Sequence, residues 1–315
     1  MSVAVVIPTR NRPETLAIML KSILIGTLLP DEIVVVDQSQ GLETKKIIVG
    51  LKKHWGIIRY IADLGSGTSH AKNLGWHSVK SKYVAFTDDD AYVDLDWLKK
   101  LVEAIETDVL CGLVGGKIVI PNLREYKHIA FPENQRYLLP CLDFGDQIKP
   151  FPKGSFPVGV NTLTRFEILR LLNGFNEDIG PNVQKRSLIF GEDTDFAQRV
   201  QHLGYSLLYA GEAIVNHPLI ESRNTECYYQ KRIRSEIYTH AVFEVNETTN
   251  WKYFQKCLLL LISSIREKLV NYLKKRKIQD YDAFIQKQEL CSHWHALFCA
   301  PRSLKRSRQF LSSSR

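Results

Sequence analysis

Short apolar runs alternate with stretches of helical periodicity through the first two-thirds of the chain. The runs are rich in Val and Ile, which is typical of buried strands. Helical stretches separate them, first from Pro13 to about Leu24 and then from Leu42 to Lys53. This alternation predicts an α/β fold with a mostly parallel central sheet and helices on both faces. The predicted strands are 3–7, 32–36, 57–62, 83–86, 206–209 and 213–215.

Acidic residues stand at the carboxyl ends of the second and fourth predicted strands. Asp37 ends the second strand, and Asp88-Asp89-Asp90 follows the fourth. Open α/β sheets bind ligands at this edge. Asp88 and Asp90 point the same way on an extended chain, so they could share one hard cation, Mg²⁺ or Mn²⁺, that holds a phosphate. The alternative is a solvated acidic turn before the next helix.

Three later residues are further candidates for the chemistry of a site. Glu192 or Asp193 could be a general base, but a helix is predicted to begin here, so the alternative is that Asp193 or Thr194 caps it. His217 ends the last predicted strand and could complete a metal's coordination shell, although lone histidines are often structural.

Gly65 and Gly67 lack the third glycine of a dinucleotide fingerprint, and the chain has no P-loop, so we expect a metal to hold phosphates.

Five short motifs carry the most specific signal. They are Val-Val-Ile-Pro-Thr-Arg-Asn-Arg at the start, Val-Val-Val-Asp at 34–37, Ala-Lys-Asn-Leu-Gly at 71–75, Phe-Thr-Asp-Asp-Asp at 86–90 and Gly-Glu-Asp-Thr-Asp at 191–195. In this order, from roughly Val3 to His217, they resemble the inverting glycosyltransferases of family 2, which adopt the GT-A fold. The stretch 159–161, followed by 174–177, is similar to the acceptor-side segment of such enzymes.

The resemblance implies a function and a division of the chain. A GT-A catalytic domain would span 1–220, with a nucleotide-sugar-binding half (1–110) and an acceptor-binding half (111–220). It would move a sugar from a nucleotide-diphosphate donor to an acceptor hydroxyl, with inversion, in polysaccharide, cell-surface glycan or glycolipid synthesis. The expected partners are therefore a nucleotide sugar and a glycan or lipid-linked acceptor.

The resemblance also implies roles for individual residues. Asp193 would be the catalytic base, and Asp90 and His217 would bind Mn²⁺ or Mg²⁺. Lys72 stands where arginine is common, which keeps the charge but removes bidentate geometry. Contacts with the donor nucleotide are implied for Pro8, Thr9, Arg10, Asp37, Lys72, Asn73, Asp88 and Asp89, and contacts with the acceptor for Gly159, Asn161 and Glu192.

Two other function classes share some of these features. A sugar-nucleotide pyrophosphorylase also has an α/β nucleotide site with a divalent ion, but its glycine-rich first loop is missing, since no glycine lies between Ile7 and Ile25. A non-catalytic nucleotide-sugar-binding protein would not need Asp193, which is present. Transfer of a sugar is therefore the preferred hypothesis.

Residues 221–315 are expected to form a basic, mainly helical extension with a mobile tail. From Trp251 onward the chain has 14 Lys and Arg against 4 Asp and Glu, a local charge of +10 compared with +8 for the whole chain. No nucleic-acid motif accompanies this charge, so no nucleic-acid partner is expected. Apolar residues at three- and four-residue steps between 251 and 272 predict an amphipathic helix, which could lie on an anionic membrane or pack on the catalytic domain.

The cysteines and the amino terminus bear on the compartment. Six scattered cysteines form no secreted framework and are expected to be free thiols in a reducing environment. The first strand starts almost at the terminus, so no signal peptide is expected and the location would be cytoplasmic, with peripheral binding to the inner face of a membrane left open. Cys291, His293, His295 and Cys299 offer four potential zinc ligands, but their spacing matches no common zinc module.

Overall fold

The computed structural model divides the chain into two compact units. The first is Met1–Ser187 with Gly191–Asn224, and the second is Leu188–Phe190 with Thr225–Arg315. The expected halves of the catalytic domain stay a prediction. The structure describes residues 1–121, 141–182, 190–219, 225–247, 255–257, 259–260 and 287–293.

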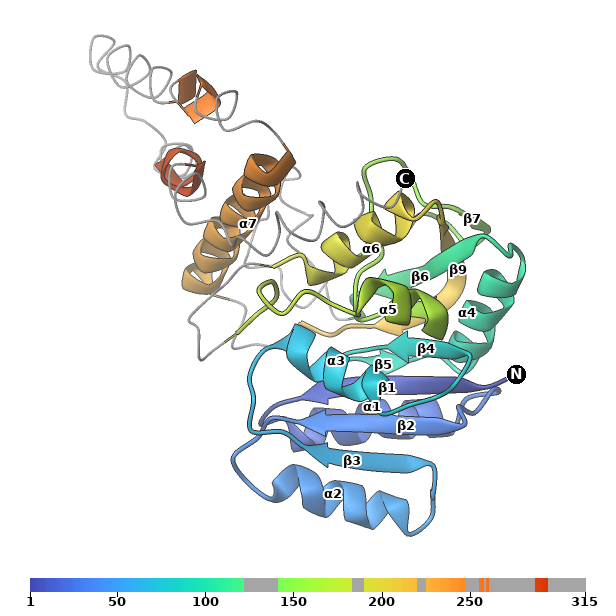
Figure 1. Cartoon of the computed structure of the whole chain (residues 1–315). Helices are drawn as coiled ribbons and strands as arrows, with labels where there is room; N and C mark the ends of the chain where they lie inside the picture. The colour runs from blue at the N-terminus through green and yellow to red at the C-terminus, as the bar shows by residue number, and fades with distance from the viewer. Residues whose placement is uncertain are drawn as a thin grey trace. The chain divides into compact units, whose positions relative to one another are not determined.

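Four parallel strands form the first half of the sheet, in the spatial order β3, β2, β1, β4 (Figure 1). They are β1 (Val3–Thr9), β2 (Glu32–Asp37), β3 (Ile58–Ala62) and β4 (Tyr83–Phe86). Helices α1 (Pro13–Leu24), α2 (Glu43–Lys52) and α3 (Thr68–His77) connect them, as the hydrophobic pattern predicts. Thr9 pairs with Asp37, and Asp37 pairs with Ala62, so the carboxyl ends of these strands meet at one edge.

The second half of the sheet is mixed, so the prediction of a mostly parallel sheet applies only to the first four strands. The strand β8 (Thr162–Arg165) runs antiparallel to both of its neighbours, β4 and β6 (Cys111–Val119). Beyond them, β9 (Ser206–Asn216) is parallel to β6, and the short strands β5 (Tyr92–Val93) and β7 (Ile148–Pro150) pair antiparallel with β9.

The prediction of two strands at 206–209 and 213–215 is wrong, because both belong to β9. The register of β9 against β6 shifts between Gly116 and Lys117: Gly116 pairs with Ala210, whereas Lys117 pairs with Ile214. The residues between Ala210 and Ile214 form a bulge, so the chain continues in the same strand instead of turning.

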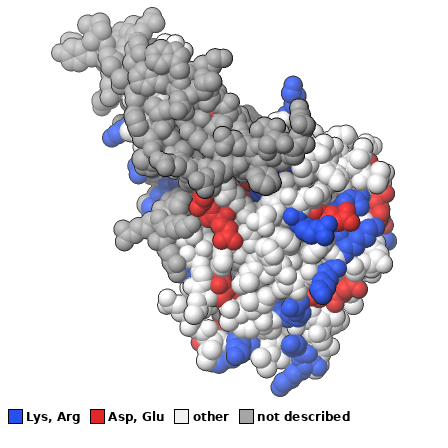
Figure 2. Space-filling model, in the orientation of Figure 1, with Lys and Arg blue, Asp and Glu red and all other residues white. Residues whose placement is uncertain are grey.

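Helices cover both faces of the sheet, as expected. Side chains of β1 alternate between two apolar clusters. Val5 belongs to the cluster that includes residues of α1, α2 and α4 (Trp97–Glu106), whereas Val6 belongs to the cluster that includes residues of α3, α5 (Phe166–Leu172) and α6 (Glu192–His202). Each face therefore has its own apolar core. On the face of the molecule in Figure 2, Lys and Arg side chains lie among Asp and Glu side chains.

One buried amide holds the bulge of β9 in place. Asn161 has no exposed surface, and its Nδ2 donates to the carbonyl oxygens of Lys117 and Ala213, each at 2.8 Å. Its Oδ1 accepts a 2.8 Å hydrogen bond from Nε1 of Trp97. Gly116 lies against this arrangement, where an added Cβ would be 2.2 Å from the Ala213 carbonyl oxygen. Asn161, expected to contact an acceptor, thus has its amide committed inside the fold.

The described residues of the second unit are helical from Glu226 onward. Helix α7 spans Glu226–Glu247, and residues 255–257, 259–260 and 287–293 are also helical. Among the described residues, no helix combines the length and apolar character that a membrane span requires. Cys111, Cys141, Cys257 and Cys291 are free thiols. Most of the amphipathic helix predicted at 251–272, together with His295 and Cys299, lies outside the described residues.

We expect Asn161→Leu to lower the free energy of unfolding by about 3 kcal/mol, because it strands two carbonyl groups and one indole N–H in the core, at about 1 kcal/mol or more each. Urea denaturation measures this loss. Asn216→Leu is the matched control: Asn216 makes an exposed hydrogen bond to Asp94, so its loss should stay below about 1 kcal/mol. Equal losses in the two variants would contradict the structural role of Asn161.

Candidate active site

A cluster of two carboxylates and one imidazole lies at the carboxyl edge of the sheet. Asp88, Asp90 and His217 each offer one ligand atom, and these atoms all lie within 4.8 Å of one another. The pairing of Tyr92 in β5 with Asn216 in β9 explains the approach, because it places the residue after β9 beside the loop after β4. Nε2 of His217 is 3.4 Å from Oδ1 of Asp90. Oxygen and imidazole donors of this kind suit a divalent cation.

The electrostatics of this cluster are unfavourable without a cation. Burial raises the pKa of Asp88 to about 7, an effect that Lys72 opposes and that Asp90 reinforces. Asp90 is itself only 6 % exposed. A bound divalent ion would stabilise the ionised carboxylates, so the donor set fits a metal.

The end of β1 and the loop after it contact Asp89, the middle carboxylate of the Asp-Asp-Asp motif. Oδ2 of Asp89 accepts a 2.8 Å hydrogen bond from Oγ1 of Thr9 and a 3.4 Å bond from the backbone N–H of Arg10. Nη1 of Arg12 lies 2.8 Å from both Oδ1 of Asp89 and Oδ2 of Asp90. Pro8 lies within β1, opposite Val36. Thr9, Arg10 and Asp89, expected to contact a donor nucleotide, therefore also hold the two loops together.

Arg12 is a site residue that the sequence predictions missed. It is the last residue of the first motif, and it is the cation that pairs with both Asp89 and Asp90. One feature of the sequence could have indicated its role: Arg12 is a basic residue that follows the first strand, at the edge of the sheet where the acidic motif is also expected. The motif alone did not indicate which of its two arginines would turn inward.

Asp37 lies at the end of β2 with only 2 % of its surface exposed. Its Oδ1 accepts the backbone N–H of Ser39 at 2.9 Å, and its Oδ2 accepts the hydroxyl of Tyr60 at 2.9 Å. Burial, together with this hydrogen bond, raises the pKa of Tyr60 to about 12. Asp37 is thus placed at the predicted edge, with each oxygen already accepting one hydrogen bond.

Lys72 and Asn73 on α3 contact later segments of the first compact unit, which is called the catalytic unit below. Nζ of Lys72 is 2.7 Å from Oδ1 of Asp193 and 3.6 Å from Oε1 of Glu192. Asn73 donates to the carbonyl oxygen of Phe175 at 2.8 Å and accepts the Phe175 N–H at 2.8 Å. Both residues were expected beside the nucleotide, and their contacts in the structure are with segments more than 100 residues later in the chain.

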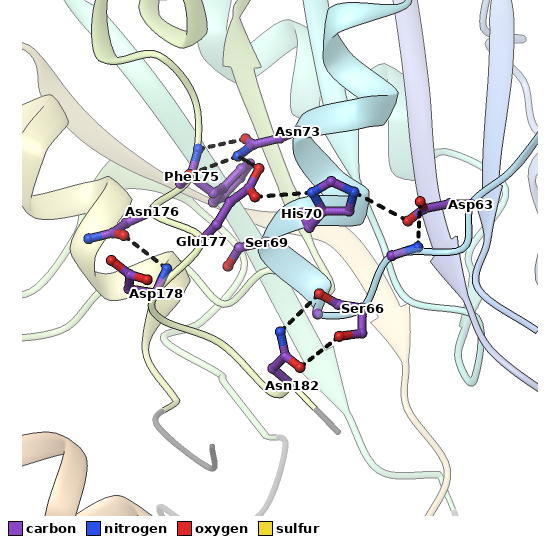
Figure 3. A network of polar contacts seen from close by, with 12 residues as sticks. Asp63, Ser66, Ser69, His70, Asn73, Phe175, Asn176, Glu177, Asp178 and Asn182 are labelled. Carbon is purple, nitrogen blue, oxygen red and sulfur yellow. Dashed lines mark hydrogen bonds and ion pairs between the residues drawn. The ribbon is translucent and has the colours of Figure 1, made fainter. Parts of the chain in front are cut away.

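A polar network, drawn in Figure 3, ties the segment after α5 to the loop before α3. Asn182 exchanges two hydrogen bonds with Ser66, and Oγ of Ser69 donates to the carbonyl oxygen of Ile179 at 2.6 Å. His70 lies between two carboxylates: its Nε2 is 3.5 Å from Oδ2 of Asp63, and its Nδ1 is 3.0 Å from Oε2 of Glu177. These contacts anchor residues 174–182 to the first half of the unit.

Asp193, the predicted base, is held from two sides at the start of α6. Its Oδ1 contacts Lys72, and its Oδ2 accepts the backbone N–H of Gly159 at 2.8 Å. An added Cβ on Gly159 would lie 2.4 Å from Asp193 and 2.5 Å from Nζ of Lys72, so a larger residue here would have to displace both side chains. Gly159, expected on the acceptor side, therefore lies directly against Asp193.

Glu192, the alternative base, differs from Asp193 in its surroundings. Its side chain is 9 % exposed, compared with 22 % for Asp193. Burial raises the pKa of Glu192 to about 7; Asp193 adds to this shift and Lys72 opposes it. The more accessible carboxylate is thus Asp193.

Two known proteins are similar in sequence to most of this chain. Glucosyl-dolichyl phosphate glucuronosyltransferase from Haloferax volcanii is 25 % identical over 260 residues, which cover 78 % of this chain and 81 % of that protein. The succinoglycan biosynthesis protein ExoM from Rhizobium meliloti is 28 % identical over 232 residues, 71 % of this chain and 69 % of that protein.

Solved structures show the same fold. A mannosyltransferase from Pyrobaculum calidifontis, in complex with GDP-Man and Mn²⁺, superposes with a TM-score of 0.59 over 94 % of this chain and 87 % of that chain, at 16 % identity. At this identity the likeness concerns the fold alone, and it confirms the predicted GT-A architecture. Residues 4–172, more than half of the chain, match the model of glycosyl transferase family 2. The chain therefore belongs to glycosyl transferase family 2.

Proposed function

We propose that the protein transfers a sugar from a nucleotide-diphosphate donor to an acceptor hydroxyl with inversion at the anomeric carbon. The observation that carries this proposal is the convergence of Asp88, Asp90 and His217, with ligand atoms within 4.8 Å of one another, at the carboxyl edge of the sheet. Family membership makes the chain a glycosyltransferase. The cluster adds a place where a metal-bound diphosphate could be held.

Asp88, Asp90 and His217 would hold Mn²⁺ or Mg²⁺. The complex of the related fold with GDP-Man and Mn²⁺ supports this choice of cofactor. When bound, such an ion acts as a Lewis acid that stabilises the negative charge growing on the leaving diphosphate. Arg12 contributes by pairing with Asp89 and Asp90, which keeps the acidic loop in one conformation.

Asp193 would be the general base, because it is the more exposed of the two candidate carboxylates. Its carboxylate takes the proton of the acceptor hydroxyl as that oxygen bonds to the anomeric carbon. The bond from this carbon to the diphosphate oxygen breaks, and its electron pair leaves with the diphosphate. One displacement of this kind inverts the anomeric carbon without a covalent sugar–enzyme intermediate.

The acceptor would be a glycan or a lipid-linked sugar. The name of the Haloferax relative specifies a dolichyl phosphate-linked acceptor, and that of the Rhizobium relative specifies succinoglycan synthesis. A lipid-linked acceptor would bring the enzyme to a membrane surface from the cytoplasmic side. The basic segment from Trp251 onward, with a charge of +10, suits the anionic lipids of such a surface.

A thermal-shift panel tests the metal and donor proposal. UDP, GDP, dTDP and CDP are each added with Mn²⁺, with Mg²⁺ or with chelator, and we expect one diphosphate to raise the melting temperature only when metal is present. Asp90→Ala should abolish this rise, because it removes a metal ligand. Asp31→Ala is the control, since Asp31 contacts Val3 at the amino end of β1, away from the site. An undiminished rise in Asp90→Ala would contradict the metal assignment.

Asp193→Asn tests the base. We expect transfer to fall by about 10²-fold or more, the usual scale for a removed base, while the metal-dependent thermal shift stays as in the wild type. Transfer is measured as release of nucleoside diphosphate from UDP-glucose, GDP-mannose, dTDP-glucose or CDP-glucose, according to the diphosphate found in the panel. Glu192→Gln is the neighbouring control and should lose less than Asp193→Asn. Full transfer by Asp193→Asn would refute the assignment.

A further inference from the structure

Lys72 is a buried cation inside the catalytic unit. Only 1 % of its surface is exposed, and it is one of the buried residues of α3. Its Nζ contacts Oδ1 of Asp193 at 2.7 Å and lies 3.6 Å from Oε1 of Glu192. Although burial lowers it, the pKa of Lys72 is raised by these two carboxylates, so the ammonium group stays charged.

The surroundings of Nζ leave little room for it to reach a nucleotide. The ring centroid of Phe175 is 5.0 Å away on one side, and an added Cβ on Gly159 would be only 2.5 Å from Nζ on the other. A contact with donor phosphates would require Lys72 to leave Asp193 and Glu192. That movement would strand two carboxylates without their counter-ion, which is strongly unfavourable at a buried site.

The contacts of Asp193 define its orientation. Lys72 occupies one side of Oδ1, and the Gly159 N–H occupies one side of Oδ2 at 2.8 Å. A carboxylate has about four acceptor positions, so roughly two remain for an acceptor hydroxyl. The ion pair and the backbone hydrogen bond together hold the plane of the carboxylate.

We propose that Lys72 is a positioning residue for Asp193, whose carboxylate it holds oriented for proton abstraction, and that it does not contact the donor. This inference rests on the proposed role of Asp193 as base. The sequence motif suggests that Lys72 contacts the donor. In the proposed role it acts on the reaction through Asp193 instead.

Lys72→Met separates the two roles, because it keeps the length of the side chain and removes the charge. We expect kcat to fall by about 10²-fold or more, because the base loses the contact that orients its carboxylate. The affinity for the nucleoside diphosphate of the panel with Mn²⁺, measured by calorimetry, should stay within about threefold of wild type. Loss of that affinity with kcat maintained would overturn the inference and make Lys72 a donor ligand.

Lys82→Met is the matched control for removal of a lysine. Lys82 precedes β4 at the opposite edge of the sheet, has a half-exposed side chain and pairs with Glu106. We expect this variant to keep the kcat and the nucleotide affinity of the wild type. An equal change in both variants would mean that the Lys72 effect is unspecific, and would overturn the inference.

A double variant covers the case in which Lys72→Met does not fold. Lys72→Met with Asp193→Asn removes the charge on both sides of the ion pair, and its transfer rate should equal that of Asp193→Asn alone, because Lys72 acts through Asp193. A further loss of tenfold or more would contradict the inference. Full transfer by Asp193→Asn would instead refute the proposed base, so the two failures can be told apart.

Discussion

The catalytic unit depends on the neutralisation of carboxylates that crowd together at one edge of its sheet. Arg12 bridges Asp89 and Asp90, and Lys72 pairs with Asp193 and lies near Glu192. Buried charges are costly unless they are paired, so these two cations make the arrangement possible. They do not balance all of the acids, and the surplus of negative charge lies at Asp88 and Asp90, where His217 adds a nitrogen ligand. A divalent cation fits this position on grounds of charge as well as geometry.

The topology of the sheet brings these groups together from distant parts of the chain. The parallel strands β1, β2 and β4 end at one edge and present Thr9, Asp37 and the acidic motif. The short strand β5 turns back beside β9 and thereby delivers His217 to Asp90. The proposed base, Asp193, comes from the start of α6 and is held by Lys72 of α3 and by the N–H of Gly159. Residues fixed in this way on regular elements are suited to a site that needs defined geometry.

Much of the fold and the general place of the site could be predicted from the sequence. Apolar runs and helical periodicity gave the first four strands and their helices, because a parallel, buried sheet leaves a strong local signal. Strand β8 was not foreseen, since Thr-Leu-Thr-Arg is only four residues long and has no apolar run. The bulge in β9 was read as a break between strands for a related reason, because Gly211 and Glu212 are locally typical of a turn.

The partners of individual side chains could not be predicted in the same way. Motif spacing placed Lys72, Asn73 and Asn161 near the site, but it carried no information about the direction in which each would point. Asn73 binds a segment 102 residues away, and Asn161 supports a bulge 52 residues away. Such pairs arise from tertiary packing, which a local pattern does not encode. The Asp-Asp-His cluster was easier to anticipate, because each member ends or follows a strand.

A crystal structure with Mn²⁺ and the stabilising nucleoside diphosphate, with anomalous data collected at the manganese edge, tests the central claim most directly. The claim is that Arg12 and Lys72 each neutralise their own carboxylates and leave one site for a divalent cation. We predict an anomalous peak bounded by Asp88, Asp90 and His217, with Nζ of Lys72 still on Asp193. A peak elsewhere, no peak, or Lys72 turned onto the diphosphate would contradict the account.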